Sequence, residues 1–207
     1  MAERIVLDAA TRDDAISRAA AALRDGAVAL LPAEGLYGYH VLASSERGVA
    51  RLQALKPRAE GKGWIGLVAR PADAYRWIAS LPGSAASLIQ ARWPGALTLV
   101  LPAGPSVPAS LVGPGGQVAL RCPGNEFLRA VVLASGGLVI STSANAPGEL
   151  PAVRSSQSEP PAEIALAVDA GELSGDPSTV VRFEGERPIL LRQGAVRLDL
   201  AEGERSG

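Results

Sequence analysis

Four of the five residues from Ser141 to Asn145 carry a hydroxyl or an amide, and they directly follow the apolar run Leu138–Ile140. In open α/β sheets, ligands bind beyond the carboxyl ends of the strands, so polar side chains there can contact phosphate or carboxylate oxygens. The alternative is a polar turn whose side chains bond only to their own main chain. The residue types alone leave both interpretations open.

A second candidate is a short stretch with three cations, Lys56, Arg58 and Lys62, which contains the only two lysines of the chain. A lysine acts as a compact point charge and an arginine as a bidentate fork, so the pair suits a polyanion such as a triphosphate. The alternative is an exposed, solvated loop. Arg121 and Arg192 each end a predicted strand, and each is either a ligand-binding residue or part of a structural salt bridge.

Several common catalytic patterns are absent from the sequence. It contains no G-x-x-x-x-G-K-[ST] phosphate loop, no G-x-G-x-x-G after a strand and no H-E-x-x-H or C-x-x-C pair, which argues against a zinc site. His40 is the only histidine, and no G-x-S-x-G motif accompanies it, so we expect an ordinary strand residue there. Cys122 is expected to be a buried structural thiol.

Composition restricts the class of protein. The chain has 207 residues, 47% of them hydrophobic, with a net charge of −1, which argues against a general electrostatic affinity for nucleic acid or membranes. No break in composition divides it, so we predict one domain over residues 1–200 and a disordered tail over 201–207. The single cysteine, the lack of a targeting segment and the absence of an apolar run near about 20 residues predict a cytoplasmic protein.

The elements that must position these residues follow from hydrophobic periodicity and from breaker residues. Helices are predicted over 11–24, 44–55, 71–78, 84–92 and 125–134. Strands are predicted over 5–7, 27–31, 39–42, 64–69, 96–101, 118–121, 138–140, 164–168, 179–183 and 189–191. Strands alternate with helices early and dominate late, so the predicted fold is α/β, a twisted mixed sheet flanked by helices.

Taken together and in order, seven segments of the sequence resemble the TsaC/YrdC family. The strings W-P-G-x-x-T and S-T-S-A-N are the most specific, and the resemblance covers roughly residues 10–195. The segments are 32–38, 55–58, 62–65, 92–98, 118–121, 141–145 and 176–179. The resemblance implies a YrdC-like fold with a concave, basic cavity, in the short form without an additional C-terminal domain.

Members of this family are threonylcarbamoyl-AMP synthases, so the resemblance implies an ATP-dependent nucleotidyltransferase. Its substrates would be L-threonine, bicarbonate or CO2, and ATP, and pyrophosphate would be released. Partner proteins would then transfer the threonylcarbamoyl group to the adenosine beside the anticodon of certain tRNAs. The motifs lack a clustered pair of carboxylates, so Mg2+ is expected to be held mainly by the ATP phosphates. The alternative is a non-catalytic paralogue that binds nucleotide or RNA.

The resemblance also assigns roles to individual residues. Lys56 and Arg58 are implied as the catalytic, phosphate-binding cations. The other implied ATP-binding residues are Thr98, Ser143 and Arg192. The implied threonine-binding residues are Tyr37, Arg121, Ser141, Asn145 and Ser178.

The sequence departs from the family pattern near the amino-acid end of the implied pocket. Ala33 stands where the family usually has a threonine, so a hydroxyl that would help to hold L-threonine is missing. The loss of a hydrogen bond to a charged group typically costs about 1.5–3 kcal/mol. Ala59 replaces the usual proline after Arg58, and Tyr39 and His40 replace small residues.

Overall fold

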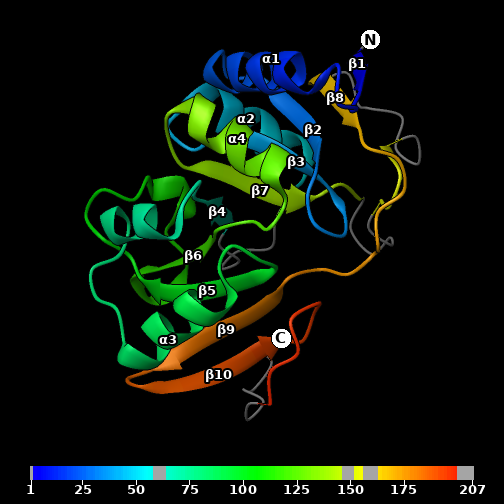
Figure 1. The fold of residues 1–207 in the computed structure, drawn as a ribbon. Helices are drawn as coiled ribbons and strands as arrows, with labels where there is room; N and C mark the ends of the chain where they lie inside the picture. The colour runs from blue at the N-terminus through cyan, green and yellow to red at the C-terminus, as the bar shows by residue number, and fades with distance from the viewer. Residues whose placement is uncertain (1, 58–63, 146–151, 156–162, 200–207) are drawn as a thin grey trace.

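In this computed structural model, the described residues are 2–57, 64–145, 152–155 and 163–199. They form one ten-stranded mixed sheet with helices on both sides (Figure 1). Its strands are β1 (Glu3–Val6), β2 (Val28–Pro32), β3 (Tyr37–Leu42), β4 (Ile65–Leu67), β5 (Leu97–Pro102), β6 (Gln117–Arg121), β7 (Val139–Ser143), β8 (Ile164–Asp169), β9 (Thr179–Glu184) and β10 (Arg187–Arg192). The helices are α1 (Arg12–Arg24), α2 (Glu46–Leu55), α3 (Gly83–Arg92) and α4 (Glu126–Ser135), with short 3-10 turns η1 (Pro71–Arg76), η2 (Ala109–Leu111) and η3 (Pro114–Gly116). The predicted α/β class and mixed sheet are confirmed.

The strand order is β1-β8-β2-β3-β7-β4-β6-β5-β9-β10. The pairs β1–β8, β2–β8, β4–β6 and β5–β9 are parallel, and the other five are antiparallel. Strand β7 lies in the middle, between β3 and β4, so its residues have neighbours on both sides. In this register Ser141 lies opposite His40 of β3 and opposite Ile65 of β4.

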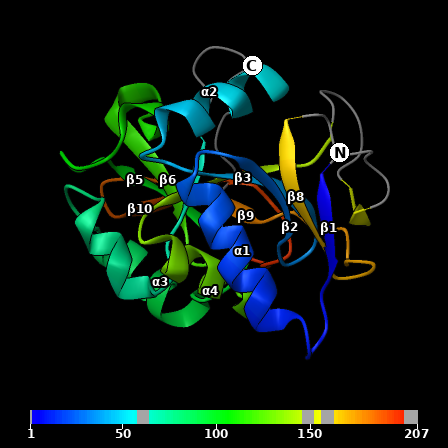
Figure 2. The same ribbon diagram turned by 90° about the horizontal axis from the view of Figure 1, so that it is seen from above.

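The helices divide the core into two layers. Helix α2 packs on one face of the sheet, where Val49 and Leu52 join Val41 and Ile140 in one hydrophobic cluster. Helices α1 and α4 cover the other face, where their alanine, leucine and valine side chains pack with Leu31, Leu67 and Val139. Figure 2 shows α2 on one side of the strands and α1 and α4 on the other. Alternation along a strand therefore directs Ser141, two residues after Val139, to the α1/α4 side.

Two expectations about local structure prove wrong. The polar run was expected to form a turn after residue 140, but β7 continues to Ser143, because Ser141, Thr142 and Ser143 pair in register with His40, Tyr39 and Gly38. The helix predicted over 71–78 is present, but it is a 3-10 helix and ends at Arg76, so its type and its end were wrong. No helix in the described ranges is long and apolar enough to cross a membrane. The predicted tail, 201–207, lies outside the described residues.

Candidate active site

A cavity of about 260 Å³ opens at the carboxyl end of β7. Its walls come from the loop before β3, from β6 and β7, from the loop before β9 and from the end of β10. The lining residues are Ala33, Glu34, Gly35, Leu36, Tyr37, Gly38, Ile65, Ala96, Arg121, Ser141, Thr142, Ser143, Asp176, Pro177, Ser178 and Arg192. Six predicted site residues are among them: Tyr37, Arg121, Ser141, Ser143, Ser178 and Arg192.

Lys56 ties the end of α2 to the end of β7. It is half-buried, and its Nζ donates to the Ser143 carbonyl at 2.5 Å, to Ser143 Oγ at 3.0 Å and to Asn145 Oδ1 at 2.7 Å. Ser143 Oγ donates to the same Asn145 oxygen at 2.7 Å. The alternative of an exposed, solvated loop is therefore wrong for Lys56, because an ammonium group with three such acceptors is part of the folded structure. Three predicted site residues, Lys56, Ser143 and Asn145, are thus in contact although they lie up to 89 positions apart in the sequence. Of these three, Ser143 lines the cavity.

Arg121 lies almost completely buried at the end of β6 and faces Glu34 from the opposite loop. Its Nη1 is 3.4 Å from Glu34 Oε2, and the other Glu34 oxygen accepts from the Gly124 main-chain nitrogen at 2.6 Å. Among the described residues, Arg121 Nε and Glu34 Oε2 have no hydrogen-bond partner although both are buried. The guanidinium therefore retains a donor that none of the described protein groups uses. Sequence reasoning missed Glu34, because nothing local indicates that it meets an arginine 87 positions away.

Ser178 is held from two sides. Its hydroxyl lies 3.0 Å from Thr98 Oγ1 and accepts from Arg192 Nη2 at 3.1 Å. Arg192 also donates from Nε and Nη2 to the Ser178 carbonyl, at 3.0 and 2.9 Å. Desolvation by the surrounding protein, followed by the positive charge of Arg121, lowers the pKa of Arg192. Two guanidinium groups thus repel each other across the cavity, which favours the binding of an anion between them.

Thr98 does not line the cavity but supports it from behind. It is fully buried and contacts Ser178. The Trp-Pro-Gly turn before it is structural: the Trp93 indole donates to the Leu97 carbonyl at 2.7 Å, and Gly95 N donates to the Cys122 carbonyl at 2.8 Å. This motif therefore sets the start of β5 and places Thr98 against Ser178.

His40 and Ser141 form a buried pair, of which Ser141 lines the cavity. The Ser141 hydroxyl lies 3.1 Å from His40 Nε2, and His40 Nδ1 lies 2.9 Å from the Gly38 carbonyl. Burial, followed by the charge of Arg121, lowers the pKa of His40 to about 3, although the Gly38 and Ala29 carbonyls act in the opposite direction. The imidazole is therefore neutral at neutral pH. Sequence reasoning treated His40 as an ordinary strand residue and missed this contact.

Tyr37 borders the cavity, but its hydroxyl is used elsewhere. It donates to the Gly171 carbonyl at 2.8 Å and accepts from Ala170 N at 2.8 Å, and burial raises its pKa. A contact between Tyr37 and a ligand stays a prediction. Arg58 lies outside the described residues, as does Lys62, so the predicted basic character of the cavity also stays a prediction.

Cys122 is confirmed as a buried thiol. Its Sγ contacts the Ala69 carbonyl at 3.6 Å, and burial raises its pKa to about 11, so it is not a thiolate at neutral pH. Within the described part of the chain, no group of three or more His, Cys, Asp or Glu residues could hold a metal ion.

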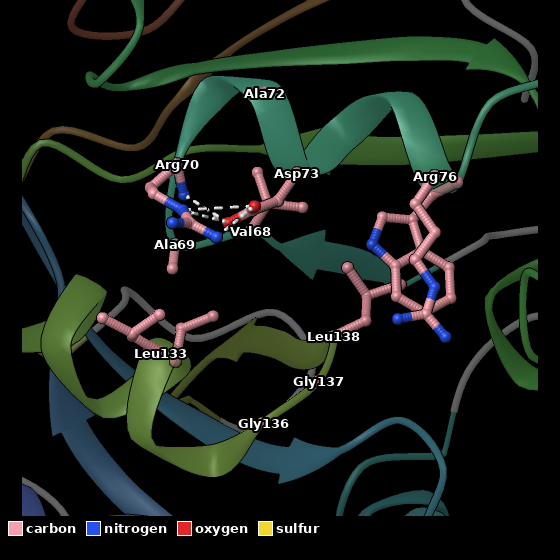
Figure 3. Close-up of a pocket in the computed structure, with 12 residues that line it drawn as sticks. Val68, Ala69, Arg70, Ala72, Asp73, Arg76, Leu133, Gly136, Gly137 and Leu138 are labelled. Atoms are coloured by element: carbon pink, nitrogen blue, oxygen red, sulfur yellow. Dashed lines mark hydrogen bonds and ion pairs between the residues drawn. The ribbon is translucent and has the colours of Figure 1, made fainter.

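A second cavity, of about 370 Å³, lies at the other end of β4 and β7 (Figure 3). Arg70 pairs with Asp73 there at 2.9 Å, and the Arg76 guanidinium lies 4.9 Å from the centre of the Trp77 ring. None of the predicted site residues lines it, so we take the cavity beside Ser141 as the candidate active site.

Comparison with known proteins shows the family of this chain. The family model Sua5_yciO_yrdC, described as "Telomere recombination", matches residues 21–194. The chain belongs to the Sua5/YciO/YrdC family. A relative from Alkalilimnicola ehrlichii named "Threonylcarbamoyl-AMP synthase" is 36% identical over 178 residues, which are 86% of this chain and 90% of that protein.

Solved structures of the same family share the fold. A structure of the P. abyssi Sua5 variant H234A/Y235A has a TM-score of 0.87 at 29% identity, over 94% of this chain and 57% of that one. A crystal structure of P. abyssi Sua5 complexed with L-threonine has a TM-score of 0.84 at 25% identity and covers 98% of this chain. This chain spans 67% of the Sua5 chain in that complex.

Proposed function

We propose that this chain is an L-threonylcarbamoyladenylate synthase, which joins L-threonine, bicarbonate or CO2, and ATP and releases pyrophosphate. One observation carries the proposal: Arg121 and Arg192 line the same cavity as several serine hydroxyls, in a chain that belongs to this family. The reaction brings a triphosphate, a carboxylate and a carbamate together, and several cations must offset their mutual repulsion. Relatives that bear the synthase name support the same conclusion.

The amino-acid side of the cavity is assigned to Arg121, Ser141 and Ser178. A guanidinium group binds a carboxylate in a bidentate manner, and Arg121 has an unused buried donor at Nε among the described residues. Threonine would therefore place its carboxylate at Arg121. The Sua5 complex with L-threonine supports an amino-acid site in this fold. Tyr37 and Asn145 stay as further proposed contacts.

The nucleotide side is assigned to Lys56, Arg58, Ser143 and Arg192, with Thr98 as the support of Ser178. The hydrogen bonds of Arg192 to Ser178 use Nε and Nη2 and leave Nη1 for a phosphate oxygen. Lys56 already binds Ser143 and Asn145, so it would act on the phosphates from that fixed position or exchange one of these acceptors. Mg2+ would arrive on the ATP phosphates.

The chemistry requires no covalent intermediate on the protein. The threonine amine adds to CO2 and loses a proton, or it attacks bicarbonate and a molecule of water leaves; either route gives a carbamate. A carbamate oxygen then attacks the α-phosphorus of ATP, the bond to the β-phosphate oxygen breaks, and pyrophosphate leaves. The contribution of the protein is to position the reactants and to stabilise their charge. The product would pass to partner proteins that modify the adenosine beside the anticodon of tRNA.

The test is product formation by the purified chain. We expect pyrophosphate and threonylcarbamoyl-AMP only when ATP, bicarbonate and L-threonine are all present. Arg192→Gln should reduce turnover at least tenfold, because the ATP phosphates lose a cation, whereas Arg187→Gln on the same strand is an exposed control and should not. Tight binding of ATP or RNA without turnover would replace this proposal with a non-catalytic, nucleotide-binding or RNA-binding role.

A further inference from the structure

The imidazole of His40 is buried behind Ser141 and next to Gly38. The ring leans back over Gly38, where a Cβ atom would lie 3.0 Å from His40 Cε1 and 2.9 Å from the Thr142 carbonyl. His40 is fully buried, while its partner Ser141 reaches the cavity. The proposed reaction gives His40 no role, although it is the only histidine of the chain.

The hydrogen bonds of the ring fix which nitrogen carries the proton. The Gly38 carbonyl can only accept, so His40 Nδ1 is the protonated nitrogen and donates to it. Because the ring is neutral, Nε2 carries no proton and can only accept. In this tautomer the serine hydroxyl donates its proton to Nε2 across the 3.1 Å contact.

A serine hydroxyl has one proton and two lone pairs. Since the proton of Ser141 is directed to His40, the hydroxyl offers only lone pairs to the cavity. We propose that His40 is a positioning residue that makes Ser141 a hydrogen-bond acceptor towards the cavity, so that this position selects a substrate group with N–H donors, the α-amino group of the amino acid. This inference rests on the proposed function, because it names the group that Ser141 contacts.

The position of Arg121 agrees with this assignment. In the sheet, Ser141 lies opposite Ile65, which pairs with Ala119, and Arg121 follows two residues later on β6. Two strand spacings and two residues separate the Cα atoms of Ser141 and Arg121 by about 12 Å. The arginine side chain spans part of this distance, and its charge acts on His40. The remaining space suits an amino acid with its carboxylate at Arg121 and its amino group at Ser141.

The same geometry also resembles a serine nucleophile activated by histidine, but the basicity of the ring decides against that role. A general base works best when its pKa is near the working pH. The pKa of His40, at about 3, lies far below neutrality, so the ring takes the Ser141 proton too poorly to generate an alkoxide. The pair therefore orients a hydrogen bond and does not transfer a proton.

The test compares two ligands that differ only in the amino group, L-threonine and (R)-3-hydroxybutanoate. Their dissociation constants are measured by calorimetry without ATP, so the result does not depend on turnover. The wild-type chain should prefer threonine, and His40→Leu should reduce this preference about tenfold, because the freed Ser141 hydroxyl can then turn its proton towards the ligand. Ser141→Ala should reduce it similarly. His40→Gln, whose amide oxygen can accept from Ser141, should restore most of the preference.

A purely structural His40 gives a different result, in which the variants weaken both ligands by the same factor or neither. That outcome overturns the inference. If His40→Leu does not fold, Ser141→Ala carries the same comparison with the ring left in place. The inference alone is refuted if the wild-type chain forms threonylcarbamoyl-AMP and all variants keep its preference for L-threonine over (R)-3-hydroxybutanoate. A wild-type chain that neither binds threonine nor forms product refutes the proposed function and the inference together.

Discussion

Ala33 occupies a tightly fixed place at the edge of the cavity. Its nitrogen donates to the Leu36 carbonyl at 3.0 Å, and its carbonyl accepts from Asn125 Nδ2 at 3.1 Å, so the loop is held from both sides. The side chain lines the cavity and also touches the hydrophobic cluster beneath α1 and α4. A larger side chain at this position would therefore act on substrate binding and on packing together.

Replacing Ala33 with threonine tests the effect of the missing hydroxyl. We expect Ala33→Thr to lower the KM for threonine severalfold. A hydrogen bond to a charged group is typically worth about 1.5–3 kcal/mol, and the cost of packing a larger side chain offsets part of this gain. Ala33→Val has the same shape without the hydroxyl and is the matched control. An equal change of KM in both variants would mean that shape, and not the hydroxyl, controls binding here.

At the scale of elements, the decisive contact is the one between α2 and β7. Lys56 follows the last residue of α2, and its ammonium group binds two residues of the segment Ser143–Asn145. The end of the helix and the wall of the cavity are thus one unit. A cation that holds the protein together cannot be removed without a cost in stability as well as in activity.

Lys56→Met keeps the length of the side chain and removes the charge. We expect it to reduce turnover strongly and to lower the free energy of unfolding by about 1–3 kcal/mol, the range for lost hydrogen bonds to a charged group. Turnover and urea unfolding should be measured on the same preparation. Gln53→Met, on the exposed side of α2, is the control. Unchanged stability in Lys56→Met would contradict the structural role of the ammonium group.

Element boundaries were predictable where periodicity and breakers agreed, as for β2, α2 and α4. They failed at β7, because serine and threonine favour turns locally while pairing with β3 extends the strand. For the site, the family motifs predicted six of the residues that line the cavity. Glu34 and His40 were not predicted, since their roles depend on contacts with Arg121 and Ser141, which lie far away in the sequence.

At the scale of the whole molecule, the buried neutral His40 makes stability depend on pH. The unfolded chain binds a proton at this side chain near pH 6.5, whereas the folded chain does so only near pH 3. The unfolded state therefore binds more protons between these values, and the free energy of unfolding falls as the pH falls. Burial, followed by the charge of Arg121, keeps the folded-state pKa of His40 low.

This linkage can be measured by urea unfolding at pH 7.5 and pH 4.5. In that interval the wild-type chain should lose about 2–3 kcal/mol more stability than His40→Leu, because each unit between the two pKa values contributes about 1.4 kcal/mol. Both chains contain the same carboxylates, so the contribution of these groups to the loss of stability cancels when the two losses are subtracted. Equal losses would show that His40 accepts a proton in the folded state.

The contact between Glu34 and Arg121 has a consequence for the binding cycle. In this structure a carboxylate of the protein faces the guanidinium, at 3.4 Å, and Glu34 Oε2 has no hydrogen-bond partner among the described residues. Under the proposed function, an arriving substrate carboxylate therefore does not meet a bare cation. It competes with Glu34 for Arg121, so Glu34 acts as an internal competitor that lowers the affinity of the site.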